Sequence, residues 1–231
     1  MEFSQYTNKS SEEVLSLFKS SRDGLTKKES VLAQKKYGLN EIKVKNVSAF
    51  KILIRQFKSP FCYLLFIAVV ISVLIGQLVD SLALLAFIVI NISFGFFQEY
   101  RAEKTAALLQ KFIPQKVKVR RDLKEGSIDK KFLVPGDIVL LESGDIVSAD
   151  LRIISAQNLL VNESQLTGES VPVSKITDAI ERPRGYPEKE IFKAKNIIFS
   201  GSSIISGKAQ AVVVATGKDT VLGSIIKTVS G

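Results

Sequence analysis

The chain has 231 residues, enough for one large domain or two small ones. Hydrophobic residues make up 46% and charged residues 24%, yet between Lys58 and Glu99 the only charged residue is Asp80. A lipid bilayer imposes this kind of segregation on a sequence. The formal net charge is +9, but the basic residues form no compact patch interleaved with aromatic residues, which disfavours a nucleic-acid binder.

Cysteine and histidine usage limits the chemistry. The sequence has no histidine and one cysteine, Cys62. These counts exclude an internal disulfide, a zinc site of the usual Cys/His kind, and Ser–His or Cys–His nucleophiles. Chemistry in this chain must therefore rest on carboxylates, hydroxyls and backbone groups. The first thirty residues are polar, so we expect no cleavable signal peptide.

Residues 1–58 are predicted to form a cytosolic helical region. The patterns Ser10-x-x-Glu13 and Thr26-x-x-Glu29 are capping boxes, in which a hydroxyl and a carboxylate satisfy the free N–H groups of a helix start. Gly38 is a plausible end of the second helix. No chemistry is identified in this region.

Residues 59–98 are predicted to form a transmembrane hairpin with spans 60–79 and 81–98, because these uncharged runs contain 20 and 18 residues. A bilayer core about 30 Å thick needs roughly 20 helical residues. The alternative, a buried helical hairpin in a soluble protein, would need a larger hydrophobic core than the remaining sequence can supply.

The flanks of the hairpin predict its orientation. Basic residues crowd both outer ends, whereas the connection 76–81 carries only Asp80, so both termini should face the cytosol. Attraction of these cations to anionic headgroups also accounts for the net charge. No proline interrupts residues 81–112, which predicts a helix of about 48 Å that continues as a cytosolic stalk over 99–115.

Residues 116–217 are predicted to be an all-β sandwich or distorted jelly roll. Short β-rich runs lie at 138–141, 151–154, 159–161, 197–200 and 209–216, and turn signals recur between them, including Ser206-Gly207-Lys208. Residues 176–195 are predicted to be a surface loop. Residues 218–231 are expected to begin a next stalk helix, in a natural truncation or a partial sequence. The fold class is thus an α+β membrane protein.

The segment 162–173 carries the most informative pattern, Thr167-Gly168-Glu169-Ser170. Gly168 permits a positive φ or close approach to a bulky anion. Glu169 is then presented on a loop, where a carboxylate can orient or deprotonate a water, as phosphate-ester hydrolysis requires. An ordinary polar turn between two strands is the alternative that this tetrapeptide alone leaves open.

The chain resembles the P-type cation-transporting ATPases, of type II and calcium-pump-like, in the order of its motifs along almost the whole length. Thr167–Ser170 is similar to the T-G-E-S signature of the actuator domain, and Val134-Pro135-Gly136-Asp137 to the V-P-G-D of that domain. Further matching pieces are Gly24-Leu25-Thr26, Tyr37-Gly38-Leu39-Asn40-Glu41, 98–104, Phe199-Ser200-Gly201 and 216–223. The chain departs from the family pattern at two positions, with Asn162 for the usual Asp and Ser148 for the usual Pro.

Two other patterns are rejected. Five residues separate the glycines of 201–208 instead of the four of a Walker loop, and Ala209 replaces the hydroxyl that would bind Mg²⁺. Lys218-Asp219-Thr220 has the letters of the phosphorylation motif D-K-T-G in the wrong order.

The resemblance implies an ion-translocating ATPase in which ATP phosphorylates an aspartate of a later domain. The actuator domain would bring its loop onto that aspartyl phosphate, with Glu169 positioning water, Gly168 allowing close approach, and Thr167 and Ser170 shaping the loop. ATP and Mg²⁺ would serve the complete pump. We expect this chain alone to bind no cofactor or metal and to be inactive, because D-K-T-G and a nucleotide-binding domain do not occur in it.

The implied partners are the lipid bilayer, the phosphorylation and nucleotide-binding domains, the later transmembrane helices and the transported cation, but no nucleic acid. The resemblance favours Ca²⁺ and leaves Na⁺/K⁺, H⁺ and Mg²⁺ open, at the plasma membrane. A rival hypothesis is a membrane-anchored β-domain that acts as a binding or regulatory module without an ATPase partner.

Overall fold

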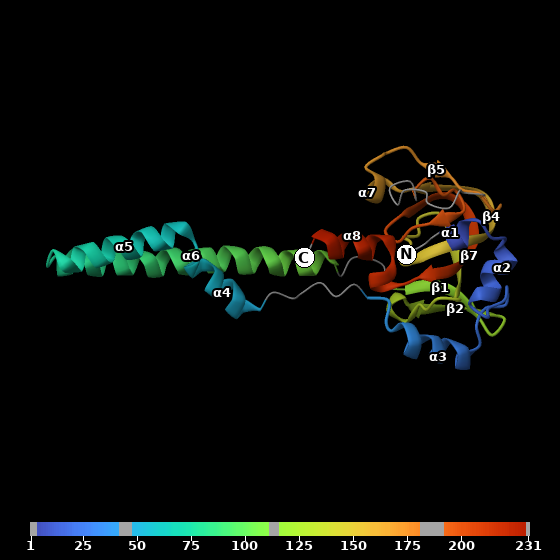
Figure 1. Cartoon of the computed structure of the whole chain (residues 1–231), viewed down its shortest axis with the longest axis horizontal. Helices are drawn as coiled ribbons and strands as arrows, with labels where there is room; N and C mark the ends of the chain where they lie inside the picture. The colour runs from blue at the N-terminus through green and yellow to red at the C-terminus, as the bar shows by residue number, and fades with distance from the viewer. Residues whose placement is uncertain (1–3, 42–47, 111–115, 181–191, 230–231) are drawn as a thin grey trace. The chain divides into compact units, whose positions relative to one another are not determined.

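The computed structural model describes residues 4–41, 48–110, 116–180 and 192–229, coloured along the chain in Figure 1. The chain divides into two units, one of Met1–Lys43 with Pro114–Gly231 and one of Val44–Ile113. The first unit has two apolar cores and the second unit has one. The first unit is β-rich, as predicted, and the second is helical.

Seven strands in the described part of the first unit form one antiparallel sheet, in the order β2-β1-β3-β7-β4-β5 with β6 beside β4. The strands are β1 Lys116–Arg121, β2 Lys124–Asp129, β3 Ile138–Glu142, β4 Asp150–Asn162, β5 Val173–Ser174, β6 Ile197–Ile198 and β7 Ser203–Ala215. A short helix η1, Lys130–Phe132, joins β2 to the turn before β3. Backbone pairing therefore connects all seven of these strands.

Apolar side chains cover both faces of the central strands β3 and β7. Val139 and Val213 belong to the first core of this unit, and Ile138 and Val212 belong to its second core. Strands buried on both faces read as continuous apolar runs instead of alternating ones. This explains why 138–141 and 209–216 are almost unbroken hydrophobic segments.

The predicted turn at Ser206-Gly207-Lys208 is wrong, because β7 continues through it. Gly207 has φ +86°, and a Cβ there would lie 2.3 Å from the backbone oxygen of Gln157. The register of β4 against β7 also shifts between Gln157 and Leu160. Glycine within a strand marks such a bulge and close backbone approach, so Gly207 bends the β4–β7 ladder without ending it.

The N-terminal helices lie against the sheet. They are α1 Ser4–Thr7, α2 Ser11–Leu17 and α3 Lys27–Tyr37, and both predicted capping boxes and the Gly38 end are present. Tyr6, Val14 and Leu15 are buried in the second core together with sheet residues. Helices α1 and α2 therefore cover part of one face of the β-domain.

The C-terminal end of the same unit consists of η3, Gly217–Asp219, and α8, Val221–Val229. A helix is thus present where the sequence predicts one. Val221, at the start of α8, is buried in the second core. Of the predicted surface loop 176–195, residues 181–191 lie outside the described residues.

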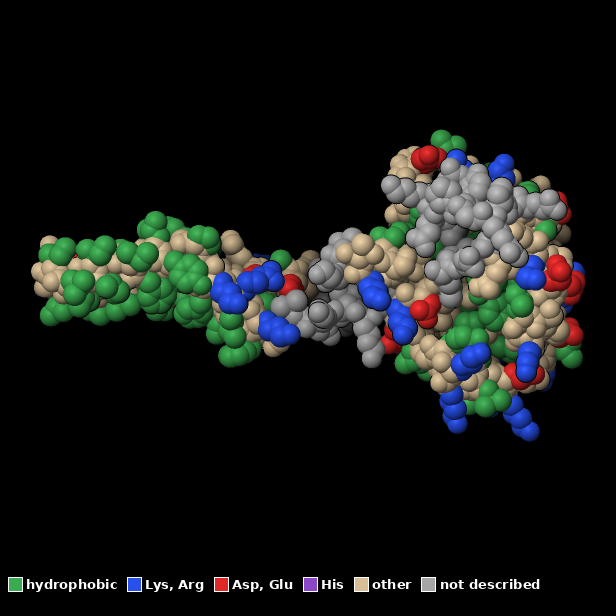
Figure 2. All heavy atoms as spheres, in the orientation of Figure 1, with side chains coloured by type: hydrophobic (Ala, Val, Ile, Leu, Met, Phe, Trp, Pro, Cys, Tyr) green, Lys and Arg blue, Asp and Glu red, His purple; other side chains and the backbone are tan. Residues whose placement is uncertain are grey.

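The second unit contains α4 Ala49–Phe57, α5 Pro60–Leu74 and α6 Leu78–Gln110. Cys62, Leu65 and Val69 of α5 pack against Ile88 and Ile92 of α6. Most other apolar side chains of α5 and α6 point outward, and Figure 2 shows them covering the visible face of this pair. Residues 111–115, the end of the predicted stalk, lie outside the described residues.

Within the described ranges, one helix, over Leu78–Thr105, is long and apolar enough to cross a membrane, and α4 and α5 would qualify together as a second span bent by 55°. Helix α4 was not predicted from the sequence. The connection is also shorter than the predicted 76–81, because α6 already begins at Leu78 and Ser81 N donates to Gln77 O (3.1 Å). Asp80 thus lies in the first turn of α6, where the helix dipole favours a carboxylate.

Candidate functional site

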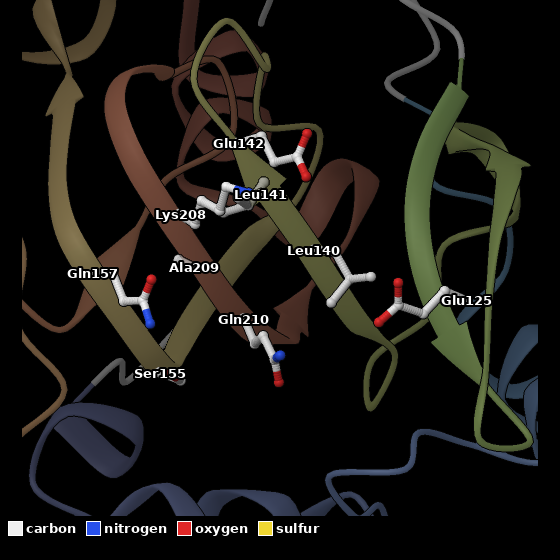
Figure 3. Close-up of a pocket in the computed structure, with 9 residues that line it drawn as sticks. All are labelled: Glu125, Leu140, Leu141, Glu142, Ser155, Gln157, Lys208, Ala209 and Gln210. Atoms are coloured by element: carbon white, nitrogen blue, oxygen red, sulfur yellow. The ribbon is translucent and has the colours of Figure 1, made fainter.

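A shallow hollow of about 230 Å³ lies on the sheet surface formed by β3, β4 and β7 (Figure 3). Its polar lining includes Glu142, Gln157 and Lys208, and the Glu142 carboxylate already pairs with Lys118 at 2.9 Å. None of the lining residues belongs to segment 162–173. Among the described residues, no group of three Cys, Asp or Glu side chains is placed to hold a metal ion.

The Thr167-Gly168-Glu169-Ser170 motif lies between β4 and β5, at the end of the short helix α7, Ser164–Thr167. Asn162 Oδ1 accepts a hydrogen bond from Ser164 N (2.9 Å) at the start of this turn. Gly168 ends it with φ +77° and ψ −4°, and its N–H donates to Ser164 O (2.9 Å). No atom lies within 4 Å of a Cβ built there, so in this chain the left-handed backbone, and not crowding, calls for glycine.

The Thr167 hydroxyl organises the inside of the loop. It donates to Glu163 O (3.1 Å) and accepts from Glu169 N (3.1 Å). The side chains of Glu169 and Ser170 are exposed beside it. The loop thus presents one carboxylate and one hydroxyl to solvent, on a backbone fixed by a second hydroxyl.

A buried ion pair lies beneath the loop. Lys175 Nζ is 2.6 Å from Glu163 Oε1, and the two side chains are 0% and 2% exposed. Burial raises the pKa of Glu163 and lowers the pKa of Lys175, while the attraction between the two opposes both shifts. Lys175 Nζ also donates to Ala194 O (3.3 Å) and lies 5.6 Å from the centre of the Phe199 ring.

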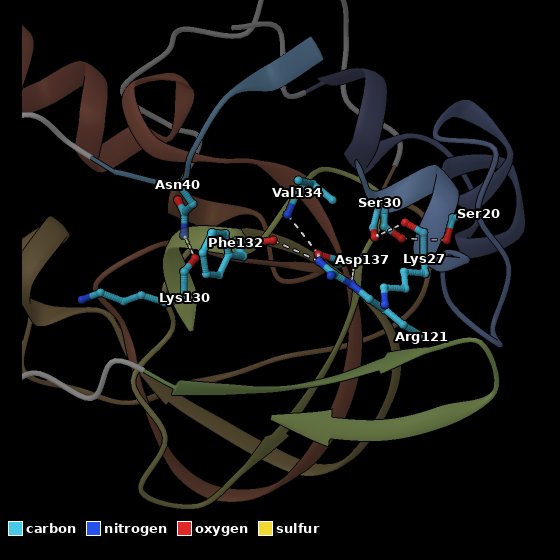
Figure 4. Close-up of polar contacts among 10 residues, drawn as sticks. Ser20, Lys27, Ser30, Asn40, Arg121, Lys130, Phe132, Val134 and Asp137 are labelled. Carbon is cyan, nitrogen blue, oxygen red and sulfur yellow. Dashed lines mark hydrogen bonds and ion pairs between the residues drawn. The ribbon is translucent and has the colours of Figure 1, made fainter. Parts of the chain in front are cut away.

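The Val134–Asp137 turn before β3 is held by a buried carboxylate. Arg121 donates from Nε and Nη2 to the two Asp137 carboxylate oxygens at 2.7 and 2.6 Å, and Val134 N donates to Oδ2 (2.9 Å), as Figure 4 shows. The Ser20 hydroxyl donates to Gly136 O (2.6 Å). This turn therefore joins the N-terminal segment to the β-domain, which is a structural role.

Asp150 connects the Phe199-Ser200-Gly201 segment to the start of α8. Its carboxylate accepts from Ser200 N and Val221 N, both at 2.8 Å. Burial raises the pKa of Asp150 to about 7, because desolvation outweighs these two hydrogen bonds. Nearby, Asn40 accepts from Gly217 N (2.7 Å) and donates to Ser148 O (2.9 Å).

A second charged residue of β4, Arg152, is completely buried and bonded to backbone carbonyls. It donates to Tyr6 O, Lys9 O and Thr177 O, each at 3.0 Å, and also to Ile153 O. Burial lowers its pKa to about 10. Arg152 thereby fastens both the N-terminal segment and the chain after β5 to the sheet.

The two departures from the resembled pattern are compatible with the local geometry. At residue 162 the structure uses only a side-chain oxygen as an acceptor from Ser164 N, which an aspartate would also supply. At residue 148 it uses the backbone carbonyl as an acceptor from Asn40, which a proline retains.

The buried charged residues around the loop were not predicted from the sequence. The four site residues predicted from the sequence, 167–170, are contiguous and lie together. Asp150, Arg152, Glu163 and Lys175 were not singled out. The available signal was the charge itself, because Asp150 and Arg152 interrupt an apolar strand run and charged residues are seldom fully buried unless they are paired.

Comparisons with known proteins show which family the chain resembles. The P-type ATPase actuator domain matches residues 111–230, just over half of the chain, and the cation transporter/ATPase N-terminus matches residues 6–72. A "Calcium-transporting ATPase" of Bacillus subtilis is 38% identical over 207 residues, which are 89% of this chain and 23% of that protein.

Two further relatives come from eukaryotes. A "Sodium/potassium exporting P-type ATPase" of Schizosaccharomyces pombe is 37% identical over 88% of this chain and 20% of its own length. A "Calcium-transporting ATPase type 2C member 1" of Mus musculus is 37% identical over 89% of this chain and 22% of its own length. The chain spans about a fifth to a quarter of these relatives, and it belongs to the P-type ATPase family, of which it carries the N-terminal region and the actuator domain.

Proposed function

We propose that this chain is the N-terminal part of an ATP-driven, type II cation pump, and that its 167–170 loop promotes hydrolysis of an aspartyl phosphate on another domain. The exposed Glu169 carboxylate, held on a loop that the Thr167 hydroxyl fixes from within, is the observation that carries the proposal. The family match supports the identity of the loop.

In this mechanism Glu169 accepts a hydrogen bond or a proton from a water molecule. The water oxygen then attacks phosphorus, and the bond from phosphorus to the aspartate oxygen breaks, which releases inorganic phosphate and the free carboxylate. General-base assistance of this kind contributes typically about 10²- to 10⁴-fold to a rate. Open space around Gly168 would admit the phosphoryl group close to the backbone. ATP supplies the phosphoryl group, and Mg²⁺ would accompany it on domains outside this chain.

The membrane part of the proposal is a hairpin with both flanks in the cytosol. The apolar helix Leu78–Thr105 and the bent pair α4 and α5 support two crossings, and the basic flanks support the orientation. The stalk at the end of α6 would transmit actuator movement to the hairpin. We place the pump in the plasma membrane, with the other pump domains and the transported cation as its partners.

Ca²⁺ is the first cation to test, because the Bacillus subtilis and mouse relatives are named calcium-transporting. The Schizosaccharomyces pombe relative is named sodium/potassium exporting, so Na⁺, K⁺, H⁺ and Mg²⁺ belong in the same test.

The test uses the complete ATPase that contains this chain, purified in detergent, with radiolabelled ATP and each candidate cation. We expect Glu169→Gln to accumulate acid-stable phosphoenzyme in the presence of the transported cation while ATP turnover falls by about 10²-fold or more. Glu125→Gln, an exposed glutamate of the same domain in β2, is the matched control and should behave as wild type. Normal turnover in Glu169→Gln would remove Glu169 from the mechanism.

A further inference from the structure

The Glu163–Lys175 ion pair lies at the two ends of the segment that carries the loop. Glu163 directly precedes α7, and Lys175 directly follows β5. With an N–O separation of 2.6 Å and almost no exposure of either side chain, the pair closes a loop whose tip, residues 167–172, is exposed. A buried ion pair therefore joins the two ends of the loop, while the tip of the loop stays exposed to water.

Hydrogen bonds connect Glu163 to Glu169. The backbone oxygen of Glu163 accepts from Leu166 N, Thr167 N and the Thr167 hydroxyl at 2.9, 3.0 and 3.1 Å. The same hydroxyl accepts from Glu169 N. A displacement of Glu163 would therefore pass through Thr167 to the backbone of Glu169.

Lys175 fixes the other end of the segment to the sheet. Its backbone N–H donates to Leu159 O (3.1 Å), and its Nζ donates to Ala194 O. Both Glu163 carboxylate oxygens are buried, and the described residues offer them no hydrogen bond beside the Lys175 ion pair. Removal of Lys175 would therefore leave the buried carboxylate without its counter-charge.

A gain in folding stability does not by itself explain why a buried ion pair occurs at this position. The desolvation cost of two buried charges can equal or exceed their attraction, and well-packed apolar residues often replace a buried ion pair without loss of stability. What an apolar pair lacks is a directional contact that fixes one end of the loop against the other.

We propose that Glu163 and Lys175 are positioning residues, a buried clamp that holds the 167–170 loop in the geometry in which Glu169 acts. This inference rests on the proposed function for its catalytic consequence, but the clamp itself can be tested without it. The two parts therefore call for separate measurements.

The first measurement is hydrogen–deuterium exchange on this 231-residue chain in detergent, together with thermal unfolding. Glu163→Gln and Lys175→Met should each increase exchange of the 166–168 amides at least about tenfold relative to wild type, while amides of β3 and β7 keep their protection. Wild-type protection of 166–168 in both single variants would overturn the clamp.

The neutral double variant Glu163→Gln/Lys175→Met separates positioning from stability. We expect it to recover most of the wild-type melting temperature while the 166–168 amides still exchange fast. Recovery of both properties would mean that the pair serves stability alone. The exposed pair Lys118–Glu142 provides the control Glu142→Gln/Lys118→Met, which should change neither.

The second measurement is phosphoenzyme formation and decay in the complete ATPase. The neutral double variant should form phosphoenzyme at the wild-type rate and hydrolyse it at least about tenfold more slowly, a split that a merely destabilised protein would not show. Slow decay in Glu169→Gln with normal decay in the double variant overturns the positioning role. Normal decay in both variants, with fast loop exchange in the double variant, refutes the proposed function and leaves the clamp intact.

Discussion

Asp150 shows how one buried carboxylate can join segments that are far apart in sequence. It lies at the first position of β4 and accepts from Ser200 N and from Val221 N, so it joins the chain after β6 to the start of α8. Because it is almost completely desolvated, its pKa rises from 3.8 to about 7. The protonated form of Asp150 is thus the one that folding favours.

The stability of the β-domain should therefore depend on pH through Asp150. Since the folded pKa lies above the unfolded one, the stabilising contribution is complete below about pH 4 and is lost as the pH rises to about 7. The loss is about 4 kcal/mol at most. We expect the wild-type chain to melt at a lower temperature at pH 8 than at pH 5, followed by circular dichroism.

Asp150→Asn cannot titrate, so the melting temperatures at the two pH values should move closer together. Asn also turns an amide group toward one of the two N–H donors, and we expect a loss of about 1–3 kcal/mol relative to wild type at pH 5, where the contribution of Asp150 is still present. Asp145→Asn is the control, because its carboxylate also accepts a backbone N–H, from Glu142 at 2.8 Å. A pH difference in Asp150→Asn equal to that of wild type would contradict this account.

At the scale of elements, the sequence was informative where local chemistry decides the structure. The capping boxes at Ser10 and Thr26 and the apolar helices follow from contacts within a few residues. The pairing of β4 with β7 depends on residues about fifty positions apart, which no local pattern encodes. Gly207 therefore looked like a turn, although its backbone packs against Gln157 of the neighbouring strand.

Two of the β-domain glycines that have a positive φ, Gly168 and Gly207, should respond differently to alanine. Gly207→Ala adds a clash with two backbone oxygens to the strain of a positive φ, and we expect a loss of about 2–5 kcal/mol. Gly168→Ala adds only the strain, about 1–2 kcal/mol, in an exposed loop.

Thermal unfolding of the two variants beside wild type tests this difference. Gly207→Ala should show a large drop in melting temperature, whereas Gly168→Ala should show a small one with faster exchange confined to the loop. Equal melting temperatures for the two variants would refute the bulge as the reason for glycine at 207.

At the scale of the whole molecule, the membrane topology is the part of the proposal that rests on charge distribution. Cys62 is the single cysteine, and it is buried between α5 and α6, so Cys62→Ser provides a cysteine-free background. In that background Gln77→Cys marks the connection between the helices, and Lys104→Cys marks the C-terminal part of α6, beyond its apolar stretch. We expect a membrane-impermeant maleimide to label intact cells at 77 but not at 104.

After the cells are opened, both positions should be labelled. Labelling of 104 in intact cells, or of neither position until the cells are opened, would contradict a hairpin with both flanks in the cytosol.

The central claim is that Glu169 acts on water during loss of the phosphoryl group, and the decay of preformed phosphoenzyme measures that step alone. The complete ATPase is phosphorylated with radiolabelled ATP and chased with unlabelled ATP, and the remaining acid-stable label is followed in time. The account predicts decay at least about 10²-fold slower in Glu169→Gln than in wild type, with equal initial labelling. Decay of the Glu169→Gln phosphoenzyme at the wild-type rate would contradict it.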